Sequence, residues 1–202
     1  HSPKDLPTAN PPGLAIAAVP EREDSHDILV IHPDAYDESR PLKFKKNAVV
    51  GTSSKRRAIQ LLHRRPDIEL KDLRGNVPTR IGKLVEGQYD AIVLAHAGYR
   101  RLGLEPDGYK LHVIDFADML PAPGQGALAI QTRESDEELR AILKPLHHQQ
   151  TADAVAAERT MLELLGGGCG TPLGTHAEQT DNGISLDVRV GPLDWEPSNE
   201  VE

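Results

Sequence analysis

Strand-like and helix-like segments alternate in a regular order between residues 48 and 104 of this 202-residue chain. The strand-like segments are short apolar runs, whereas the helix-like segments have apolar residues spaced three or four apart. This order predicts a β-α-β-α-β-α unit around a largely parallel sheet, which is typical of the α/β class. The predicted strands are residues 48–51, 68–73 and 89–95, and the predicted helices are residues 55–65, 77–87 and 96–104.

Further elements are predicted on both sides of this unit. Residues 120–133 are read as a glycine loop that enters a strand. Since 38% of the residues are hydrophobic but only 3% are aromatic, aliphatic side chains have to fill most of the core. The additional strands are residues 13–19, 27–32 and 184–191, and the additional helices are residues 135–146 and 151–165.

Basic residues are concentrated in one segment of an otherwise acidic chain. The formal net charge is −8, which argues against a general affinity for nucleic acid. Between residues 49 and 101, however, there are 11 Lys and Arg against 5 Asp and Glu, whereas the rest of the chain has 12 against 26. An acidic protein with one basic segment predicts a confined site for an anionic ligand.

The sequence has no visible feature that would direct the chain to a membrane or an oxidising compartment. No apolar run approaches the ~20 residues of a membrane-spanning helix, and the first residues lack the pattern of a signal peptide. The single cysteine cannot form an internal disulfide, which suits a reducing compartment. The expected location is therefore cytoplasmic, or a plastid in a photosynthetic eukaryote.

Three successive loops after the predicted strands carry arginines. The first loop, Gly51 to Arg57, also offers hydroxyls and the free N–H groups of a helix N-terminus. Because consecutive parallel strands deliver such loops to one edge of a sheet, we expect the guanidinium groups to converge on an anion cleft. They suit carboxylates, which they bind through two parallel hydrogen bonds. Taken alone, the first loop is equally compatible with an ordinary capped helix and solvated arginines. The arginines are Arg56, Arg57, Arg74, Arg80, Arg100 and Arg101.

The lone cysteine, Cys169, follows three glycines just after a predicted helix. Glycines at this point indicate that another group comes close to the backbone or that a group is attached there. A helix C-terminus is the wrong pole for lowering a thiol pKa, which counts against a catalytic thiolate. Two interpretations of Cys169 stay open: a structural cysteine in a tight turn, and a cysteine whose sulfur is permanently modified.

Two further groups of candidate functional residues give only a weak signal when taken alone. Lys4 and Asp5 are adjacent near the start of the chain, and Gln125 lies between two glycines that could present its amide to a ligand. The histidines show no spacing typical of a metal site, so no metal is expected.

Seven stretches taken together resemble the porphobilinogen deaminase family, whose members are also called hydroxymethylbilane synthases. The stretches occur in the family's order along nearly the whole chain, which is far more specific than any one motif. They are HSPKDLP, EREDSHD, VGTSSKRR, LRGNVPTR, YDAIVLAHAGYRRLG, LPAPGQGALAI and AERTMLELLGGGCGTPLG.

The resemblance implies a transferase that polymerises four porphobilinogen units into hydroxymethylbilane during tetrapyrrole (haem or chlorophyll) biosynthesis. It implies that Cys169 carries a covalent dipyrromethane cofactor as a primer, and that Asp5 is the catalytic carboxylate. Asp5 would bind pyrrole N–H groups and stabilise the cationic azafulvene formed as porphobilinogen loses ammonia. The implied cofactor-binding residues are Ser2, Lys4, Asp5, Ser54, Arg56 and Arg57, and the implied substrate-binding residues are Thr52, Arg74, Asn76, Arg80, Arg101 and Gln125.

The same resemblance implies a three-domain monomer that binds neither nucleic acid nor membrane. Two lobes like those of periplasmic binding proteins would face a cleft, and a small α+β domain would carry the cofactor. The expected domains are residues 1–40 with 119–146, residues 41–118, and residues 147–202. Because the family has further sequence at both ends, the chain is expected to be truncated before His1 and after Glu202.

Two other functions are compatible with parts of the pattern. A non-catalytic two-lobed module that binds carboxylates or other anions would use the arginines but need neither Asp5 nor Cys169. A phosphate-ester enzyme would use the helix N-terminus after Gly51, and it would normally need a metal site.

Overall fold

A five-stranded sheet forms the centre of the computed structural model, which describes residues 1–3, 11–168 and 170–195. Its strands are β2 (Asp27–Ile31), β3 (Val49–Gly51), β4 (Glu69–Lys71), β5 (Ala91–Ala95) and β6 (Lys110–Val113). They lie in the order β4-β3-β5-β2-β6. Strand β3 is parallel to β4 and β5, which confirms the predicted β-α-β-α-β unit. Strand β2 runs antiparallel to β5 and β6, so the sheet is mixed.

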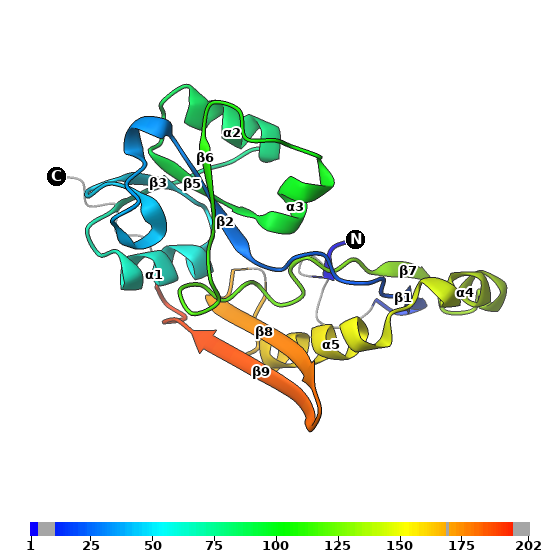
Figure 1. Ribbon diagram of the computed structural model, residues 1–202. Coiled ribbons are helices and arrows are strands. Elements are labelled where there is room, and N and C mark those ends of the chain that lie inside the picture. The colour runs from blue at the N-terminus through cyan, green and yellow to red at the C-terminus, as the bar shows by residue number, and fades with distance from the viewer. Residues whose placement is uncertain (4–10, 169, 196–202) are drawn as a thin grey trace.

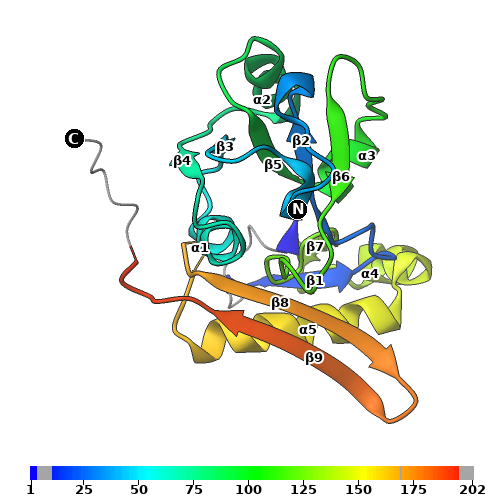
Figure 2. The same ribbon diagram turned by 60° about the vertical axis from the view of Figure 1, so that its left-hand side comes forward.

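Three helices cover the two faces of this sheet: α1 (Lys55–Arg64), α2 (Val77–Val85) and α3 (His96–Arg101). Helix α1 lies on one face, and α2 and α3 lie on the other (Figures 1 and 2). Helix α1 begins after Ser54, whose hydroxyl oxygen accepts a hydrogen bond from the N–H of Arg57. Helix α2 begins after Asn76, as predicted, because the Asn76 carboxamide oxygen accepts a hydrogen bond from the N–H of Thr79.

Strand β2 is buried on both of its faces and therefore contributes to two hydrophobic cores. Its residues point alternately to the two sides of the sheet. One set packs in a cluster with Leu61 of α1, and the other set packs with Leu84 of α2 and Tyr99 of α3. The continuous apolar run Ile28–Ile31 fits a strand that has helices on both faces.

The second part of the molecule lies below the sheet in Figure 1 and contains two antiparallel ribbons and two helices. Its elements are β1 (Leu14–Ala18), β7 (Ile130–Arg133), α4 (Glu137–Leu143), α5 (Gln149–Leu164), β8 (Leu173–Thr180) and β9 (Gly183–Val190). Strand β1 pairs with β7, β8 pairs with β9, and α5 packs along β8. Short 3₁₀ turns occupy Pro33–Ala35, Pro41–Lys43 and Lys144–Leu146. Within the described residues, no helix combines the length and the apolar character that crossing a bilayer requires.

Two crossing segments join the sheet to the second part: residues 19–26 lead into β2, and residues 114–129 leave β6. The rings of His26 and Phe116, one from each segment, stack with their centroids 3.8 Å apart. Phe116 also lies 4.0 Å from the ring of His176 in β8. The stacked rings therefore connect both crossing segments to β8 in the second part of the molecule.

Strand β2 belongs to the five-stranded sheet, although the sequence analysis places residues 1–40 in the first domain. The reason is its pairing, because β2 is hydrogen-bonded on its two sides to β5 and β6, which follow it in the chain. An apolar run predicts a strand but does not indicate which other strands will pair with it.

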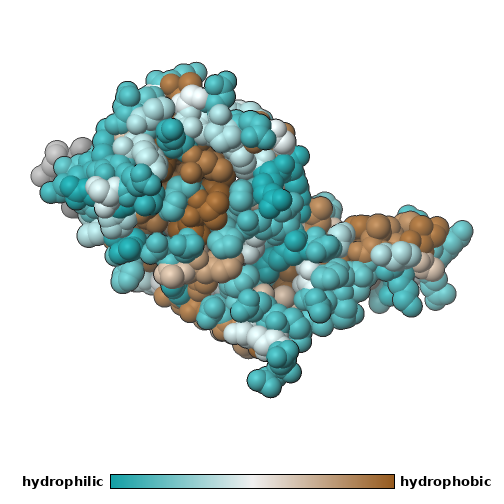
Figure 3. All heavy atoms as spheres, viewed as in Figure 1, coloured by the Kyte–Doolittle hydropathy of each residue, from teal (hydrophilic) through white to brown (hydrophobic). Residues whose placement is uncertain are grey.

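Apolar side chains gather at two places on the face shown in Figure 3: a hollow over the sheet, and the end of the molecule that carries α4. Leu139 and Ile142 of α4 are both exposed. Since α4 has no buried residue, its position depends on its contacts with β1 and the adjoining 3₁₀ turn.

The two crossing segments approach each other closely at Gly126. This glycine has a φ of 84°, and a Cβ atom there would collide with the carbonyl oxygen of Glu23. We expect Gly126→Ala to lower the free energy of unfolding by about 3 kcal/mol or more, because backbone strain and a collision add together. Urea unfolding monitored by circular dichroism measures this loss.

Gly103→Ala is the matched control for that substitution. Gly103 also has a positive φ, 61°, but a Cβ atom there would meet nothing within 4 Å. The free energy of unfolding of Gly103→Ala should therefore fall only by the backbone cost of about 1–2 kcal/mol. Equal losses for the two variants would contradict the proposed collision.

Candidate functional site

A cavity of about 170 Å³ lies where the start of α1 meets the second part of the molecule. Three segments that are far apart in the sequence line it: the start of α1, the glycine loop (residues 121–129), and the turn between α5 and β8. The cavity therefore joins the first arginine loop to the residues on either side of Cys169. The lining residues are Ser54, Arg56, Arg57, Ala122, Pro123, Gln125, Leu162, Gly168, Thr171 and Leu173.

Arg56 and Arg57 are buried in the wall of this cavity and share the carboxylate of Asp27. Arg56 Nη1 donates a hydrogen bond to Asp27 Oδ2 over 2.6 Å, and Arg57 Nη2 donates to Asp27 Oδ1 over 2.7 Å. The two guanidinium groups also donate to the backbone carbonyls of Leu120 and Val93, over 2.7 and 3.2 Å. The arginines are therefore parts of a buried network and hold fixed orientations.

Asp27 is completely buried, with 0% of its surface exposed, and it is ionised at neutral pH. Burial alone would raise the pKa of its carboxyl, but the charges and hydrogen bonds of Arg56 and Arg57 outweigh this effect and lower the pKa to about 2. Burial lowers the pKa of Arg56, and the charge of Asp27 opposes that shift. Two guanidinium charges and one carboxylate leave one net positive charge in the cavity wall.

The direction of β2 explains why Asp27 meets these arginines. Because β2 runs antiparallel to β5, its first residue, Asp27, lies opposite Ala95, the last residue of β5. That end of the sheet is also where β3 finishes and α1 begins. The carboxylate therefore arrives at the carboxyl-end edge of the parallel strands, next to the first turn of α1.

The glycine loop enters the same network through the buried side chain of Gln125. Gln125 Nε2 donates to Asp27 Oδ1 over 3.0 Å and to the carbonyl oxygen of Ser25 over 2.8 Å. From the sheet side, Arg101 Nη2 donates to the carbonyl oxygen of Gly126 over 2.8 Å. The Gln125 amide N–H groups are thus used within the protein, and the loop is held firmly against the arginine pair.

Other predicted substrate residues lie at varying distances from the pair. Arg80 is half-buried, and its pKa is lowered by burial and by the charge of Arg57. Thr52 is buried, and its hydroxyl oxygen accepts a hydrogen bond from the N–H of Ser54. Arg74 is exposed and pairs with Asp72 over 2.8 Å. The structure therefore brings Arg56 and Arg57 together in one cavity wall, whereas Arg80 donates to the carbonyl oxygen of Gly75 and Arg74 is paired with Asp72.

Three predicted site residues, Lys4, Asp5 and Cys169, lie outside the described residues. Ser2 is described and half-buried. The carbonyl oxygen of Pro3 accepts a hydrogen bond from the guanidinium group of Arg159 in α5, which ties the start of the chain to the second part.

The glycines around Cys169 have different structural causes. Gly166 has a φ of 60° just after α5, and a Cβ atom at Gly167 would collide with the side chain of Thr171. At Gly168 and Gly170, which flank Cys169, a Cβ atom would meet none of the described atoms within 4 Å. The local geometry therefore favours glycine at two of the preceding positions, whereas no contact with the described residues explains the two flanking glycines.

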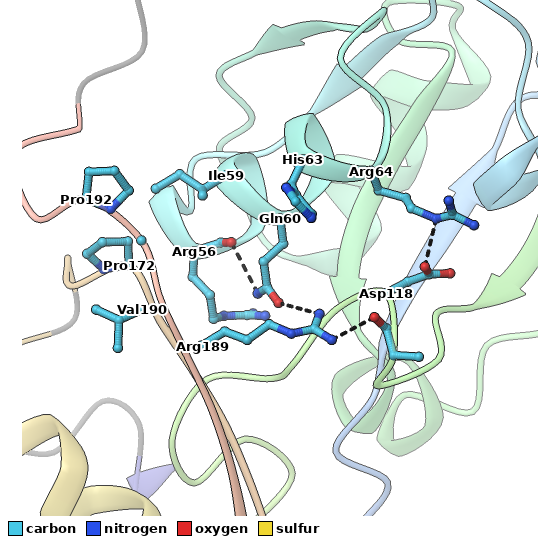
Figure 4. A pocket seen from close by; sticks show the side chains of 12 residues that line it. Arg56, Ile59, Gln60, His63, Arg64, Asp118, Pro172, Arg189, Val190 and Pro192 are labelled. Atoms are coloured by element: carbon cyan, nitrogen blue, oxygen red, sulfur yellow. Dashed lines mark hydrogen bonds and ion pairs between the residues drawn. The ribbon is translucent and has the colours of Figure 1, made fainter.

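A larger hollow of about 630 Å³ runs along the side of α1 that carries Ile59, Gln60 and His63 (Figure 4). Its cations already have partners. Arg64 pairs with Asp118 over 2.8 Å, and Arg189 Nη2 donates to the carbonyl oxygen of Ala117 over 2.7 Å. Because its described lining does not include Gly168 or Thr171, we place the candidate site in the smaller cavity.

Sequence reasoning did not identify Asp27 or the buried ion pair of Arg22 with Glu158. Glu158 accepts two hydrogen bonds from Arg22 and others from the N–H groups of Gly124 and Ala177, so it holds the glycine loop against β8. Two features of the sequence pointed to these residues: a charged residue directly before the apolar run of β2, and a glutamate at a helix position that faces the core. Neither feature indicates which residue would pair with the buried charge.

These features define an α/β protein with a positively charged cavity at the carboxyl-end edge of its sheet, where proteins of this class bind ligands. No group of three or more His, Cys, Asp or Glu side chains that could hold a metal ion occurs among the described residues. Comparison with known proteins identifies the family. Residues 1–141 match the family model described as porphobilinogen deaminase, dipyrromethane cofactor-binding domain, and residues 152–202 match porphobilinogen deaminase, C-terminal domain. The chain belongs to the porphobilinogen deaminase family.

Curated relatives with this name support the assignment. The chain is 45% identical over 196 residues to the porphobilinogen deaminase of Syntrophobacter fumaroxidans, covering 97% of this chain and 62% of that protein. It is 49% identical over 207 residues to that of Phenylobacterium zucineum, covering 100% of this chain and 62% of that protein. The chain thus spans less than two thirds of the length of these relatives.

Solved structures of similar shape include an arginine-specific periplasmic binding protein of Salmonella typhimurium. It is 14% identical, has a TM-score of 0.41, and the match covers 70% of this chain and 61% of that chain. The periplasmic VFT2 domain of BvgS from Bordetella pertussis is 18% identical with a TM-score of 0.40, over 73% of this chain and 60% of that chain.

The buried network predicts an abnormal titration of Asp27. Because its pKa in the folded protein is about 2, below the usual value of 3.8, ionised Asp27 stabilises the fold above pH 4. This stabilisation is lost as the pH falls from about 4 toward 2. In the folded protein at pH 3, we expect the Asp27 Cγ resonance, assigned by comparison with Asp27→Asn, to report a mainly ionised carboxylate. A mainly protonated Asp27 at pH 3 would contradict the network.

Proposed function

We propose that the protein to which this chain belongs is a hydroxymethylbilane synthase, which joins four porphobilinogen units with loss of ammonia. One observation carries the proposal: the cavity that contains Arg56 and Arg57 is also lined by Gly168 and Thr171, which bracket Cys169. Family membership supports it, because the model that matches residues 1–141 is that of a dipyrromethane cofactor-binding domain.

The residues that line the cavity suit a dipyrromethane group attached to Cys169. Among the described residues, no atom would contact a Cβ atom at Gly168, the wall carries one net positive charge, and Ser54 adds a hydroxyl. At about 170 Å³ the cavity is smaller than the ~300 Å³ of a typical small-molecule pocket, so the group would extend beyond it. When bound, a dipyrromethane group would supply the pyrrole carbon to which the first substrate unit is joined.

The chain's own residues would then bind and orient carboxylates. Each pyrrole unit of porphobilinogen carries two carboxylate side chains, and guanidinium groups bind carboxylates strongly in a partly enclosed site. Arg56 and Arg57 would bind a carboxylate of the cofactor, whereas Arg80 and Arg101 would bind substrate carboxylates. Arg74 would have to exchange Asp72 for a ligand, since the two now form an ion pair.

Asp5 is proposed as the catalytic carboxylate, with Ser2 and Lys4 as supporting residues. A carboxylate next to the pyrrole N–H groups stabilises the positive charge that develops as ammonia leaves. Pro3, two residues before Asp5, is buried, and its carbonyl oxygen accepts a hydrogen bond from Arg159 of α5. Thr52, Asn76 and Gln125 are proposed to act through the backbone geometry of their loops.

The wider architecture is also a proposal. Three domains are proposed, with the sheet as the second domain and the α5-β8-β9 segment as the start of the third. A monomer in the cytoplasm that binds neither nucleic acid nor membrane would suit a small, highly charged substrate. A non-catalytic anion-binding module is the alternative, and nothing in its role would require Cys169 to carry a group.

The mass of the purified protein distinguishes these functions. We expect the protein to carry an adduct equal to two porphobilinogen units without their ammonia, and we expect Cys169→Ser to abolish it. Intact mass spectrometry with mapping of the peptide around residue 169 measures both. A protein that is fully active without any adduct would contradict the proposal.

Asp5→Asn serves as the companion variant. It should keep the adduct on Cys169 but lose most turnover of porphobilinogen, because it retains the attachment site and removes the stabilising charge. Normal turnover of Asp5→Asn would remove Asp5 from the catalytic role, whereas loss of both adduct and turnover would assign Asp5 to cofactor assembly.

A further inference from the structure

Asp27 is a buried acid at the candidate site that the proposed reaction does not use. Both of its carboxylate oxygens are occupied: Oδ2 accepts from Arg56, and Oδ1 accepts from Arg57 and Gln125. Arg57 also donates to Oδ1 through Nε, over 3.1 Å. A carboxylate held by three side chains from two other segments has a fixed plane, so it also fixes the guanidinium groups that bind it.

The charges explain why such a residue is needed. Arg56 and Arg57 are neighbours in sequence, both are buried, and the charge of each disfavours the charge of the other. Two buried like charges repel strongly, whereas a shared carboxylate lets them lie side by side. With Asp27 in place, one positive charge remains uncompensated, which matches the charge of a single carboxylate group on a ligand.

The backbone leaves Asp27 little freedom to move. Strand β2 is hydrogen-bonded to β5 on one side and β6 on the other, and Asp27 itself lies opposite Ala95. A longer acidic side chain at this position could keep the charge, but it could not keep both oxygens in the same place. The position of the carboxylate can therefore be tested separately from its charge.

We propose that Asp27 is a positioning residue, which holds Arg56 and Arg57 side by side so that they bind one ligand carboxylate as a pair. The ligand class, a pyrrole carboxylate, rests on the proposed function. The positioning itself rests on the contacts of Asp27 and applies to any small carboxylate.

Turnover of porphobilinogen by the holoenzyme tests the position of the carboxylate. Asp27→Glu should lower kcat at least tenfold and change the KM for porphobilinogen less than threefold, because the displaced arginines would misplace the cofactor carboxylate, whereas Arg80 and Arg101, which are proposed to bind the substrate, are unaltered. Asp67→Asn is the matched control, since it removes the carboxylate that binds Arg65 at the other end of α1, over 2.7 and 2.8 Å. It should lower stability and leave kcat unchanged.

A folded Asp27→Glu protein with an unchanged kcat would overturn the proposal. So would an equal loss of kcat for Asp67→Asn, since that result would assign the effect to general loss of stability. Thermal unfolding of each variant identifies any protein that has not folded.

A measurement on Cys169→Ser keeps the proposal testable if Asp27→Glu does not fold, because this variant keeps Asp27 and should lack the adduct that would otherwise occupy the arginine pair. Addition of propionate, which has a carboxylate but no pyrrole, should shift the ¹⁵N–¹H resonances of Arg56 and Arg57 Nε. The resonance of Arg65 Nε, which is paired with Asp67, should not move. Unshifted Arg56 and Arg57 resonances would overturn the proposal.

The two methods also separate this proposal from the proposed function. If propionate shifts both arginine resonances in Cys169→Ser but the unaltered protein neither binds nor turns over porphobilinogen, the positioning role of Asp27 stands and the proposed function fails. If the unaltered protein turns over porphobilinogen while propionate shifts neither resonance in Cys169→Ser, the proposed function stands and the positioning role fails.

Discussion

The buried carboxylate of Asp27 is the interaction on which the candidate site depends. It binds two guanidinium groups from the first turn of α1 and the amide of Gln125 from the glycine loop. Removal of one partner from such a buried network typically costs about 3–5 kcal/mol, because the remaining charges are left without compensation. One side chain therefore links the sheet, its first helix and the loop that leads to the second part of the molecule.

The same loop is held from the other direction by contacts of the second part. Glu158 of α5 binds Arg22 from one crossing segment and the N–H of Gly124 from the other. The ring stack of His26, Phe116 and His176 adds a third connection between the two parts. The wall of the cavity is thus assembled from segments that are joined to one another by buried contacts.

Local order was predictable from the sequence, whereas the partners of buried charges were not. The alternation after residue 48 predicted the parallel strands, and the asparagine before Val77 correctly predicted the cap of α2. The arginine loops pointed to one edge of the sheet, but the sequence could not show that Asp27 would arrive there. That depends on the antiparallel direction of β2, which follows from long-range pairing rather than from local pattern. For the same reason, the expected domain boundary at residue 40 did not include β2 in the sheet.

A crystal structure of the protein with bound porphobilinogen would test the central claim most directly. The account predicts that a carboxylate of the pyrrole ligand or of the cofactor lies within hydrogen-bonding distance of both Arg56 and Arg57, while both arginines keep their bonds to Asp27. A ligand bound elsewhere, or arginines that leave Asp27 and turn away from the cavity, would contradict it.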